Sequence, residues 1–245
     1  MKREIIKIIS KLILADKTVN IKLLGDSITH GVGGTGFEQN GEPIVADFRR
    51  NPDGYCWAKQ FKEHCEATYN CKVTNNACTG TTINFILENF DALVSPEDDI
   101  VICTIGTNNR HQFFADGPKK TRDEMMKNFY GWIVALNSKF KAANKDVIFV
   151  ANIPACTNNE QDTCEYWRIL HMNDINDLYL KASAECGFPL VSMYNAMVEY
   201  CELSEITLEE LLDDGLHPND HGYDIMFSLI LRELGLGKKT YVIEN

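Results

Sequence analysis

Residues 21–31 read IKLLGDSITHG, a short apolar run that ends in glycine, aspartate and serine. Four more short apolar runs follow along the chain, and stretches with helical spacing separate them. These runs cover residues 71–77, 99–106, 146–153 and 189–194. Short strands that alternate with helices are typical of a parallel sheet covered by helices on both faces. The sequence therefore predicts an α/β fold with a central five-stranded parallel sheet.

The stretches between the strands complete five strand–helix units. Helices are expected near residues 54–69, 81–93, 121–143, 163–186 and 221–234. Within residues 121–143, apolar side chains recur at helical spacing, which indicates a buried helix face. These are Met125, Met126, Phe129, Trp132 and Ile133.

The length of 245 residues is ordinary for one α/β domain, and no repeat or linker divides the chain. We therefore predict a single domain over residues 1–245. The one compositional break is residues 31–56, which are rich in glycine and contain two prolines. Because this stretch follows the first strand directly, we expect a long loop insertion beside the functional site.

Residues 1–17 begin with basic side chains and continue with apolar ones. Lys7 and Lys11 interrupt the apolar run, and no small-residue cleavage pattern follows, so a signal peptide is not expected. The run is also too short to span a bilayer. The apolar residues recur at helical spacing, which predicts an amphipathic helix packed on the domain. An interfacial membrane anchor is the alternative.

The composition excludes several classes of protein. With 44% hydrophobic and 24% charged residues, the chain is predicted to be folded and soluble rather than disordered. A formal net charge of −11 repels phosphate backbones, so nucleic acid is not an expected partner. Nine cysteines without a CxxC spacing exclude a zinc ribbon. An odd number of scattered thiols favours a reducing compartment, and we predict a cytoplasmic protein.

Polar residues gather where the predicted strands end, which is where parallel sheets bind ligands. A serine hydroxyl attacks an acyl carbon only if a base takes its proton and fixed donors stabilise the oxyanion. Ser27 follows the first strand, and Asp214 and His217 lie three residues apart in a predicted turn. The carboxylate can hold one imidazole nitrogen while the other faces the serine. Taken alone, this pair also fits a surface Asp and His beside a helix N-terminus.

Four blocks of the chain, in this order, resemble those of the SGNH hydrolase superfamily, also called GDSL-like esterases. GDSIT contains Ser27, Gly80 lies in the second block, GTNN contains Asn108, and DGLHPN contains Asp214 and His217. The resemblance extends from about residue 20 to residue 235. It implies a three-layer α/β/α sandwich with a flavodoxin-like sheet.

The resemblance also implies a role for each matched residue. Ser27 corresponds to the nucleophile, His217 to the general base and Asp214 to the carboxylate that orients it. The backbone N–H groups of Ser27 and Gly80 and the amide of Asn108 correspond to the oxyanion hole. Chemistry of this class requires no cofactor and no metal.

Other polar residues adjoin the matched blocks. Asp26, His30, Arg110 and His111 are candidates for contacts with hydroxyl or carboxylate groups of a substrate. The loop that follows Gly31 is longer than in compact members of the superfamily, so substrate choice is expected to differ from theirs.

The resemblance to carbohydrate O-acetylesterases indicates a serine esterase that removes a short acyl group, acetyl above all, from a carbohydrate or another hydroxylated small molecule. A lysophospholipase or thioesterase acting on longer acyl chains is an alternative. An acyltransferase and a catalytically inert ligand-binding module are two others.

Three competing interpretations of the sequence lack support. Gly31, Gly33 and Gly36 satisfy GxGxxG, but the match begins beyond the strand and no helix pattern follows it. The serine is not in a GxSxG elbow, which argues against an α/β-hydrolase of that type. A metal cluster around Asp214 and His217 has no supporting Cys or His spacing.

Overall fold

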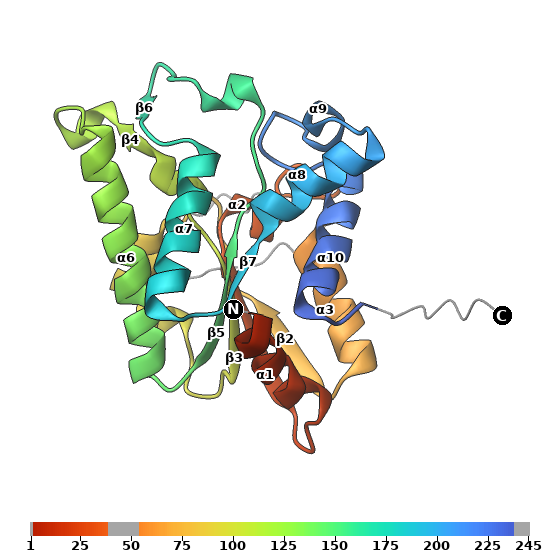
Figure 1. Ribbon diagram of the computed structural model, residues 1–245. Helices are drawn as coiled ribbons and strands as arrows, with labels where there is room; N and C mark the ends of the chain where they lie inside the picture. The colour runs from red at the N-terminus through yellow and green to blue at the C-terminus, as the bar shows by residue number, and fades with distance from the viewer. Residues whose placement is uncertain (1, 39–53, 238–245) are drawn as a thin grey trace.

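The computed structural model describes residues 2–38 and 54–237. Within it, five parallel strands form the central sheet in the order β2-β1-β3-β5-β7 (Figure 1). Counted within this sheet, the order is 2-1-3-4-5, the flavodoxin-like arrangement. All five predicted strands are present, so the predicted α/β fold is confirmed. The strands are β1 (Val19–Gly25), β2 (Cys71–Asn75), β3 (Ile100–Thr104), β5 (Asp146–Ala151) and β7 (Leu190–Ser192).

The position of β3 at the centre of the sheet explains why this strand is almost entirely apolar. Every residue of β3 is buried, and β3 pairs with β1 on one side and β5 on the other. Successive side chains of a strand point to opposite faces. Ile100 and Ile102 therefore pack into the hydrophobic core on one face, whereas Val101 and Cys103 pack into the core on the other. Both faces of the sheet need apolar cover.

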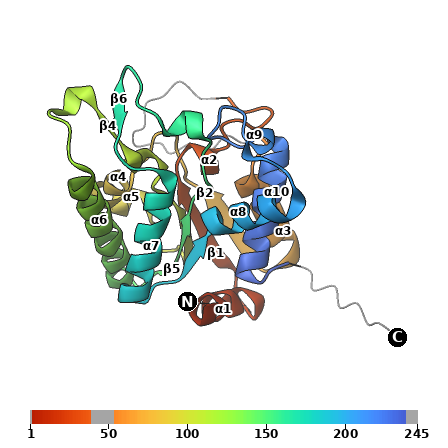
Figure 2. The same ribbon diagram turned by 45° about the horizontal axis from the view of Figure 1, so that its top comes forward.

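Helices supply this cover, and together with the sheet they make the predicted three-layer sandwich, which is confirmed (Figures 1 and 2). One layer contains α1 (Lys2–Ile13), α3 (Trp57–Thr68), α8 (Met193–Ser204), α9 (Leu208–Leu211) and α10 (Asp220–Leu234). The other contains α4 (Ile83–Glu88), α5 (Phe90–Leu93), α6 (Arg122–Ala142) and α7 (Met172–Cys186).

Several predicted boundaries are wrong. The helix predicted over residues 163–186 begins only at Met172, because the first part of that range includes β6 (Tyr166–Arg168). This strand pairs antiparallel with β4 (His111–Phe113) in a small second sheet. The helix predicted over 81–93 is interrupted at Asn89, whose side-chain amide donates to the Phe85 carbonyl.

Two helices near the C-terminal strand were not predicted. The strand predicted over 189–194 ends at Ser192, whose hydroxyl accepts a hydrogen bond from the Asn195 N–H and so caps α8. The short helix α9 follows α8. The apolar residues of α8 were taken for the continuation of a strand because a short apolar run has no decisive period.

The N-terminal helix α1 buries Ile5, Ile8, Ile9 and Leu12 and ends at Ile13, short of the predicted residue 17. Of the predicted loop insertion at 31–56, residues 39–53 lie outside the described residues. Among the helices of residues 2–38 and 54–237, none combines the length and the apolar character needed to cross a bilayer.

Candidate active site

The candidate nucleophile begins a short helix at the carboxyl end of β1. The helix α2 (Ser27–His30) follows directly after Gly25 and Asp26. A Cβ at Gly25 would lie 2.4 Å from Thr29 Oγ1 and 2.8 Å from the Thr104 carbonyl oxygen, so the close strand-to-helix turn requires glycine here. The Asp26 carboxylate accepts a hydrogen bond from the Ile28 N–H and caps the helix.

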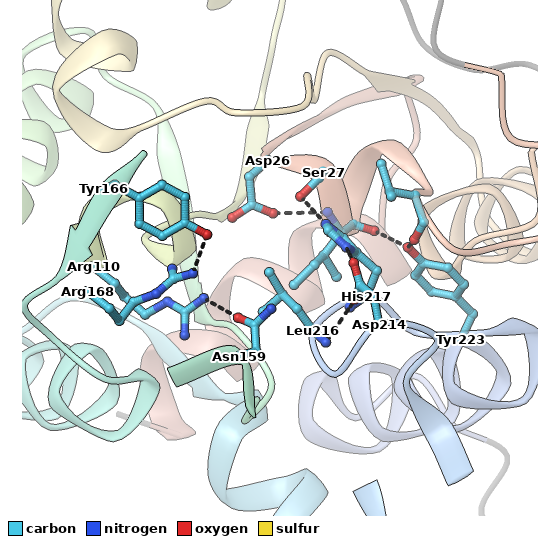
Figure 3. Close-up of polar contacts among 12 residues, drawn as sticks. Asp26, Ser27, Arg110, Asn159, Tyr166, Arg168, Asp214, Leu216, His217 and Tyr223 are labelled. Atoms are coloured by element: carbon cyan, nitrogen blue, oxygen red, sulfur yellow. Dashed lines mark hydrogen bonds and ion pairs between the residues drawn. The ribbon is translucent and has the colours of Figure 1, made fainter. Parts of the chain in front are cut away.

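Three side chains that are far apart in the sequence form a continuous hydrogen-bonded chain. Ser27 Oγ lies 2.8 Å from His217 Nε2, across 190 positions of sequence. On the other side of the ring, His217 Nδ1 lies 2.7 Å from Asp214 Oδ2. Figure 3 shows the serine, the imidazole and the carboxylate in this order. The geometry allows the imidazole to accept the serine proton while the carboxylate fixes its tautomer.

The loop that precedes α10 holds this imidazole in place. Asp214 Oδ1 accepts hydrogen bonds from the N–H groups of Leu216 at 3.0 Å and His217 at 2.8 Å. Between them, Gly215 has a φ of +80°, which only glycine adopts without strain. The His217 carbonyl also accepts a hydrogen bond from the Asp213 N–H. The ring is therefore oriented before a substrate arrives.

Asp214 is ionised in this arrangement. Partial burial by itself raises the pKa of the carboxyl, but the hydrogen bonds from the His217 ring and from two backbone N–H groups outweigh it. Its pKa therefore lies well below the usual range. The negative charge favours the imidazolium that forms when His217 takes up a proton.

Three hydrogen-bond donors belong to residues that line the cavity with Ser27 Oγ. Within the described part of the chain, the N–H groups of Ser27 and Gly80 have no hydrogen-bond acceptor. The Asn108 side-chain amide donates one hydrogen to the Thr81 carbonyl at 3.0 Å, which leaves its second hydrogen free to point elsewhere. Ser27, Gly80 and Asn108 line the same cavity. Donors placed in this way can stabilise an oxyanion.

The cavity has a volume of about 730 Å³ and contains Ser27, Asp214 and His217 in its lining. Most of the other lining side chains are polar. They are Thr79, Thr82, Asn84, Asn108, Asn109, His111, Gln112, Asp116, Lys120, Asn159, Glu165, Tyr166 and Arg168. The apolar ones are few: Phe113, Met125, Trp132 and Leu216.

Three of the four residues predicted to contact the substrate occupy different places. His111 lines the cavity, whereas Asp26 and His30 do not. The carboxylate of Asp26 is completely buried, accepts a hydrogen bond from Asn152 Nδ2 at 3.0 Å, and has a pKa raised to about 6 by this burial. His30 is also buried, lies 3.1 Å from the Thr79 hydroxyl through Nδ1, and has a pKa lowered by burial.

Arg110, expected beside the substrate, has an internal role instead. Its side chain is fully buried and donates to the Thr107 carbonyl, to Glu160 at 2.9 Å and to Asn159 at 3.1 Å. Burial, and then the neighbouring Arg168, lower its pKa to about 10, so it stays charged. The guanidinium ties the 3-10 helix Thr107–Arg110 to the 3-10 helix Thr157–Glu160, which precedes β6.

Sequence reasoning missed several residues of the site. Asn152 follows β5 directly, and its amide bridges Asp26 and the Thr107 hydroxyl. The rule that ligands lie at strand ends applies to Asn152 as it does to Ser27. Tyr166 and Arg168 lie on a strand of three residues, which is too short to produce a recognisable alternation.

Comparison with known proteins identifies the family of the chain. Residues 23–225 match the model of the GDSL-like Lipase/Acylhydrolase family, and the chain belongs to this family. The fold and the family define it as an SGNH hydrolase that acts on ester bonds. Among curated proteins, none matches the chain.

Solved structures share the fold at low sequence identity. An α/β hydrolase from the metagenome of Lake Arreo, Spain, is 20% identical, with a TM-score of 0.67 over 91% of this chain and 98% of that one. The acetylxylan esterase Axe2 from Geobacillus stearothermophilus is 18% identical, with a TM-score of 0.64 over 90% and 96%. A two-domain esterase active on acetylated mannans is 20% identical, with a TM-score of 0.62 over 95% of this chain and 52% of that one.

Proposed function

We propose that this protein is a serine esterase that hydrolyses short-chain esters, above all acetyl esters, of a carbohydrate or another hydroxylated small molecule. The observation that carries the proposal is the chain of hydrogen bonds from Ser27 through His217 to Asp214, at 2.8 and 2.7 Å, in the lining of a cavity where polar side chains outnumber apolar ones. In this proposal these three residues are the catalytic triad.

The reaction begins when Ser27 Oγ attacks the acyl carbon and its proton passes to His217 Nε2. The resulting oxyanion is bound by the N–H groups of Ser27 and Gly80 and by the Asn108 amide. The intermediate collapses, His217 protonates the leaving alkoxide, and an acyl-enzyme remains on Ser27. A water molecule then gives a proton to His217 and attacks the acyl carbon, which releases the carboxylic acid and restores the serine hydroxyl.

The lining of the cavity supports a short acyl group on a hydroxylated partner. Amide, hydroxyl and imidazole groups dominate it, and His111 is among them. Such groups pair with sugar hydroxyls, whereas a long acyl chain gains its affinity from apolar surface. Two of the structural neighbours, Axe2 and the two-domain esterase, are described as esterases of acetylated polysaccharides.

The test of chain length is a series of p-nitrophenyl esters from C2 to C8, followed by measurement of acetate released from acetylated xylooligosaccharides. A value of kcat/KM that is highest at C2 supports the proposal. A maximum at C8 contradicts it and favours a lysophospholipase or thioesterase.

The two remaining alternatives need a different experiment. A fluorophosphonate probe labels an activated serine, so a mass increase that Ser27→Ala abolishes excludes an inert binding module. An acyltransferase would also be labelled. Adding an excess of an acceptor alcohol distinguishes it, because acyl transfer then replaces release of the free acid.

We also propose that the protein works in the cytoplasm. All nine cysteines are free thiols in the structure, and Cys56, Cys65, Cys103 and Cys156 are buried. Free thiols persist in a reducing compartment. Cell fractionation followed by immunoblotting tests this proposal, and recovery of the protein only outside the cytoplasm contradicts it.

A further inference from the structure

The small sheet of β4 and β6 forms one wall of the cavity, hereafter the β4–β6 wall (residues 111–113 and 166–168). Its side chains His111, Tyr166 and Arg168 line the cavity. The Arg168 guanidinium lies 4.8 Å from the centre of the Tyr166 ring and donates through Nη2 to the Tyr166 hydroxyl at 2.9 Å. The Tyr166 ring also packs against the His111 ring, with 4.5 Å between their centres. These contacts fix the position of the guanidinium.

Arg168 has no carboxylate of its own among the described residues. Its Nε atom is buried and has no hydrogen-bond partner. The Nη1 atom also has no partner in that part of the chain, but it is not buried. A guanidinium carries five N–H donors, and few of them are used here. The Nη1 group therefore remains available to a molecule in the cavity.

The two acidic residues whose charges act on Arg168 are already engaged. Glu160 forms an ion pair with Arg110 at 2.9 Å and accepts the Met172 N–H with its other oxygen. Asp162 accepts the Arg168 backbone N–H and forms an ion pair with Lys119 at 3.4 Å. Arg168 therefore keeps a positive charge that no carboxylate of the described residues offsets within ion-pair distance.

This unpaired charge lies away from the proposed chemistry. Figure 3 shows Arg168 and Tyr166 on one side of the site and Ser27 with His217 on the other, with Asn159 and Leu216 between them. A substrate that spans the cavity can therefore place its ester at Ser27 and a different group at Arg168. In a protein with a net charge of −11, a cation left uncompensated at this place is suited to a negatively charged group.

We propose that Arg168 binds a carboxylate of the substrate, so that the natural substrate is an ester of an acidic sugar such as a uronate, or of another hydroxy acid. A guanidinium matches a carboxylate in shape and hydrogen bonding. One unpaired charge suits a singly charged carboxylate better than a doubly charged phosphate. This inference rests on the proposed esterase function, because it concerns the same cavity.

The experiment compares two acetyl esters that differ only in a carboxylate: a monoacetylated methyl galacturonide and the matching methyl galactoside. The wild type is expected to favour the acidic ester in kcat/KM by at least about tenfold, since hydrogen bonds to charged groups contribute about 1.5–3 kcal/mol. Arg168→Gln should lower this ratio by about 10- to 100-fold, mainly through KM. Arg168→Lys keeps the charge and should retain part of the preference.

Arg232→Gln is the matched control, because it removes the same charge from the far end of α10. Its guanidinium is exposed and pairs with Glu199 and Glu233. Asp220 begins α10 beside the site, and twelve residues of helix carry Arg232 about 18 Å along the axis. The ratio between the two esters should be the same in this variant as in the wild type.

The outcomes separate the two proposals. Hydrolysis of p-nitrophenyl acetate that depends on Ser27, with no preference for the acidic ester, overturns the carboxylate site and leaves the esterase standing. An unchanged ratio in Arg168→Gln does the same. If no ester is hydrolysed and the fluorophosphonate probe does not label Ser27, both proposals fail.

A measurement on the wild type covers the case in which Arg168→Gln does not fold. Free galacturonate and free galactose are compared as inhibitors of p-nitrophenyl acetate hydrolysis. Galacturonate should inhibit at a concentration at least about ten times lower, from the same charged hydrogen bond. Equal inhibition by the two sugars contradicts the carboxylate site.

Discussion

Two walls of the same cavity differ in how their titratable side chains are hydrogen-bonded. On the nucleophile wall (Ser27, Gly80, Asn108, Asp214 and His217), the serine, imidazole and carboxylate are hydrogen-bonded to one another. On the β4–β6 wall, Arg168 Nε and His111 Nδ1 are buried and have no partner among the described residues. The side chains of the nucleophile wall are already hydrogen-bonded in the order that acyl transfer to Ser27 requires. The second wall has hydrogen-bonding capacity that the protein itself does not use.

The two walls also differ in how they are built. Ser27 follows a strand that pairs with neighbours on both sides, at the centre of the fold. The β4–β6 wall consists of two strands of three residues each, supported by aromatic contacts between Phe113 and Tyr166 and between Phe114 and Trp167. A two-stranded sheet has little stability by itself. Side chains on this wall can therefore change with little effect on the position of the nucleophile.

The largest effect is expected from removal of the nucleophile. Ser27→Ala should lower kcat for p-nitrophenyl acetate by about 10⁴- to 10⁶-fold, and Asp214→Asn by about 10⁴-fold, because the three residues act as a unit. Initial rates at equal folded concentration, checked by circular dichroism, measure the loss. Ser138→Ala on α6 is the control, since its hydroxyl bonds only the Val134 carbonyl one helical turn away. More than a tenth of the activity in Ser27→Ala contradicts the assignment.

The next effect concerns the support of the β4–β6 wall. Arg110→Met should lower the free energy of unfolding by about 3–5 kcal/mol, because it leaves Glu160 without its buried partner. Arg122→Met serves for comparison: this guanidinium is 56% exposed and pairs with Asp174, so the loss should stay below about 1 kcal/mol. Urea unfolding followed by fluorescence measures both. Equal losses would mean that Arg110 does not support the wall.

The oxyanion donors belong to the nucleophile wall. Asn108→Ala should lower kcat by about 10²- to 10³-fold, with a smaller change in KM, since the amide acts on charge that develops in the transition state. Steady-state kinetics with p-nitrophenyl acetate measure the two constants separately. Asn128→Ala on α6, a partly buried asparagine outside the cavity lining, is the control. A change confined to KM would assign Asn108 to substrate binding instead.

Asp26 should make stability depend on pH. Burial raises its pKa from 3.8 to about 6, so the folded state holds a proton that the unfolded chain has already lost. The wild type is therefore destabilised as pH rises from about 4 to about 6, by roughly 3 kcal/mol in total, and its stability no longer depends on this group at higher pH. Asp26→Asn removes this dependence, so its stability relative to the wild type should increase over that range.

Urea unfolding at several pH values between 4 and 7 measures this difference. The exposed Asp91→Asn variant, on α5, should differ from the wild type by a nearly constant amount across the series. A constant difference for Asp26→Asn as well would show that burial does not disfavour the charged form of Asp26.

The smallest effect is expected at the rim of the β4–β6 wall. Phe113 lines the cavity and is 48% exposed, whereas its neighbour Phe114 is 40% exposed but packs on Trp167 outside the lining. Phe113→Ala should raise KM for an acetylated oligosaccharide by about 2- to 10-fold, the loss of one aromatic contact. Phe114→Ala should raise it less. A reversed order would place the sugar on the other side of the wall.

The inner strands were predictable because their environment is uniform. Strands β3 and β5 lie between two apolar layers, so each consists almost entirely of apolar residues. The strands of the β4–β6 wall show no such apolar run in the sequence. Tyr166, Trp167 and Arg168 are each partly buried, and three residues of mixed character were absorbed into a predicted helix.

Arg110 and Arg168 show what could not be predicted about the site from the sequence. Arg110 and Arg168 are the same residue type on segments that meet at the second sheet. Only Arg110 was predicted to contact the substrate, because it lies beside a matched block. In the structure Arg110 is buried and paired with Glu160, whereas Arg168 lines the cavity without an acidic partner among the described residues. Neither outcome could be inferred from the residues next to them.

By itself, the sequence determined the parallel α/β sheet and the order of the blocks that carry Ser27, Gly80, Asn108, Asp214 and His217, because hydrophobic periodicity and short motifs are local properties of a chain. Only the tertiary structure decided which side chains face the cavity and which charges stay unpaired. Burial and charge compensation depend on partners distant in sequence, such as Glu160 for Arg110 and Asn152 for Asp26. Those partners are set by packing, and packing is a property of the whole fold.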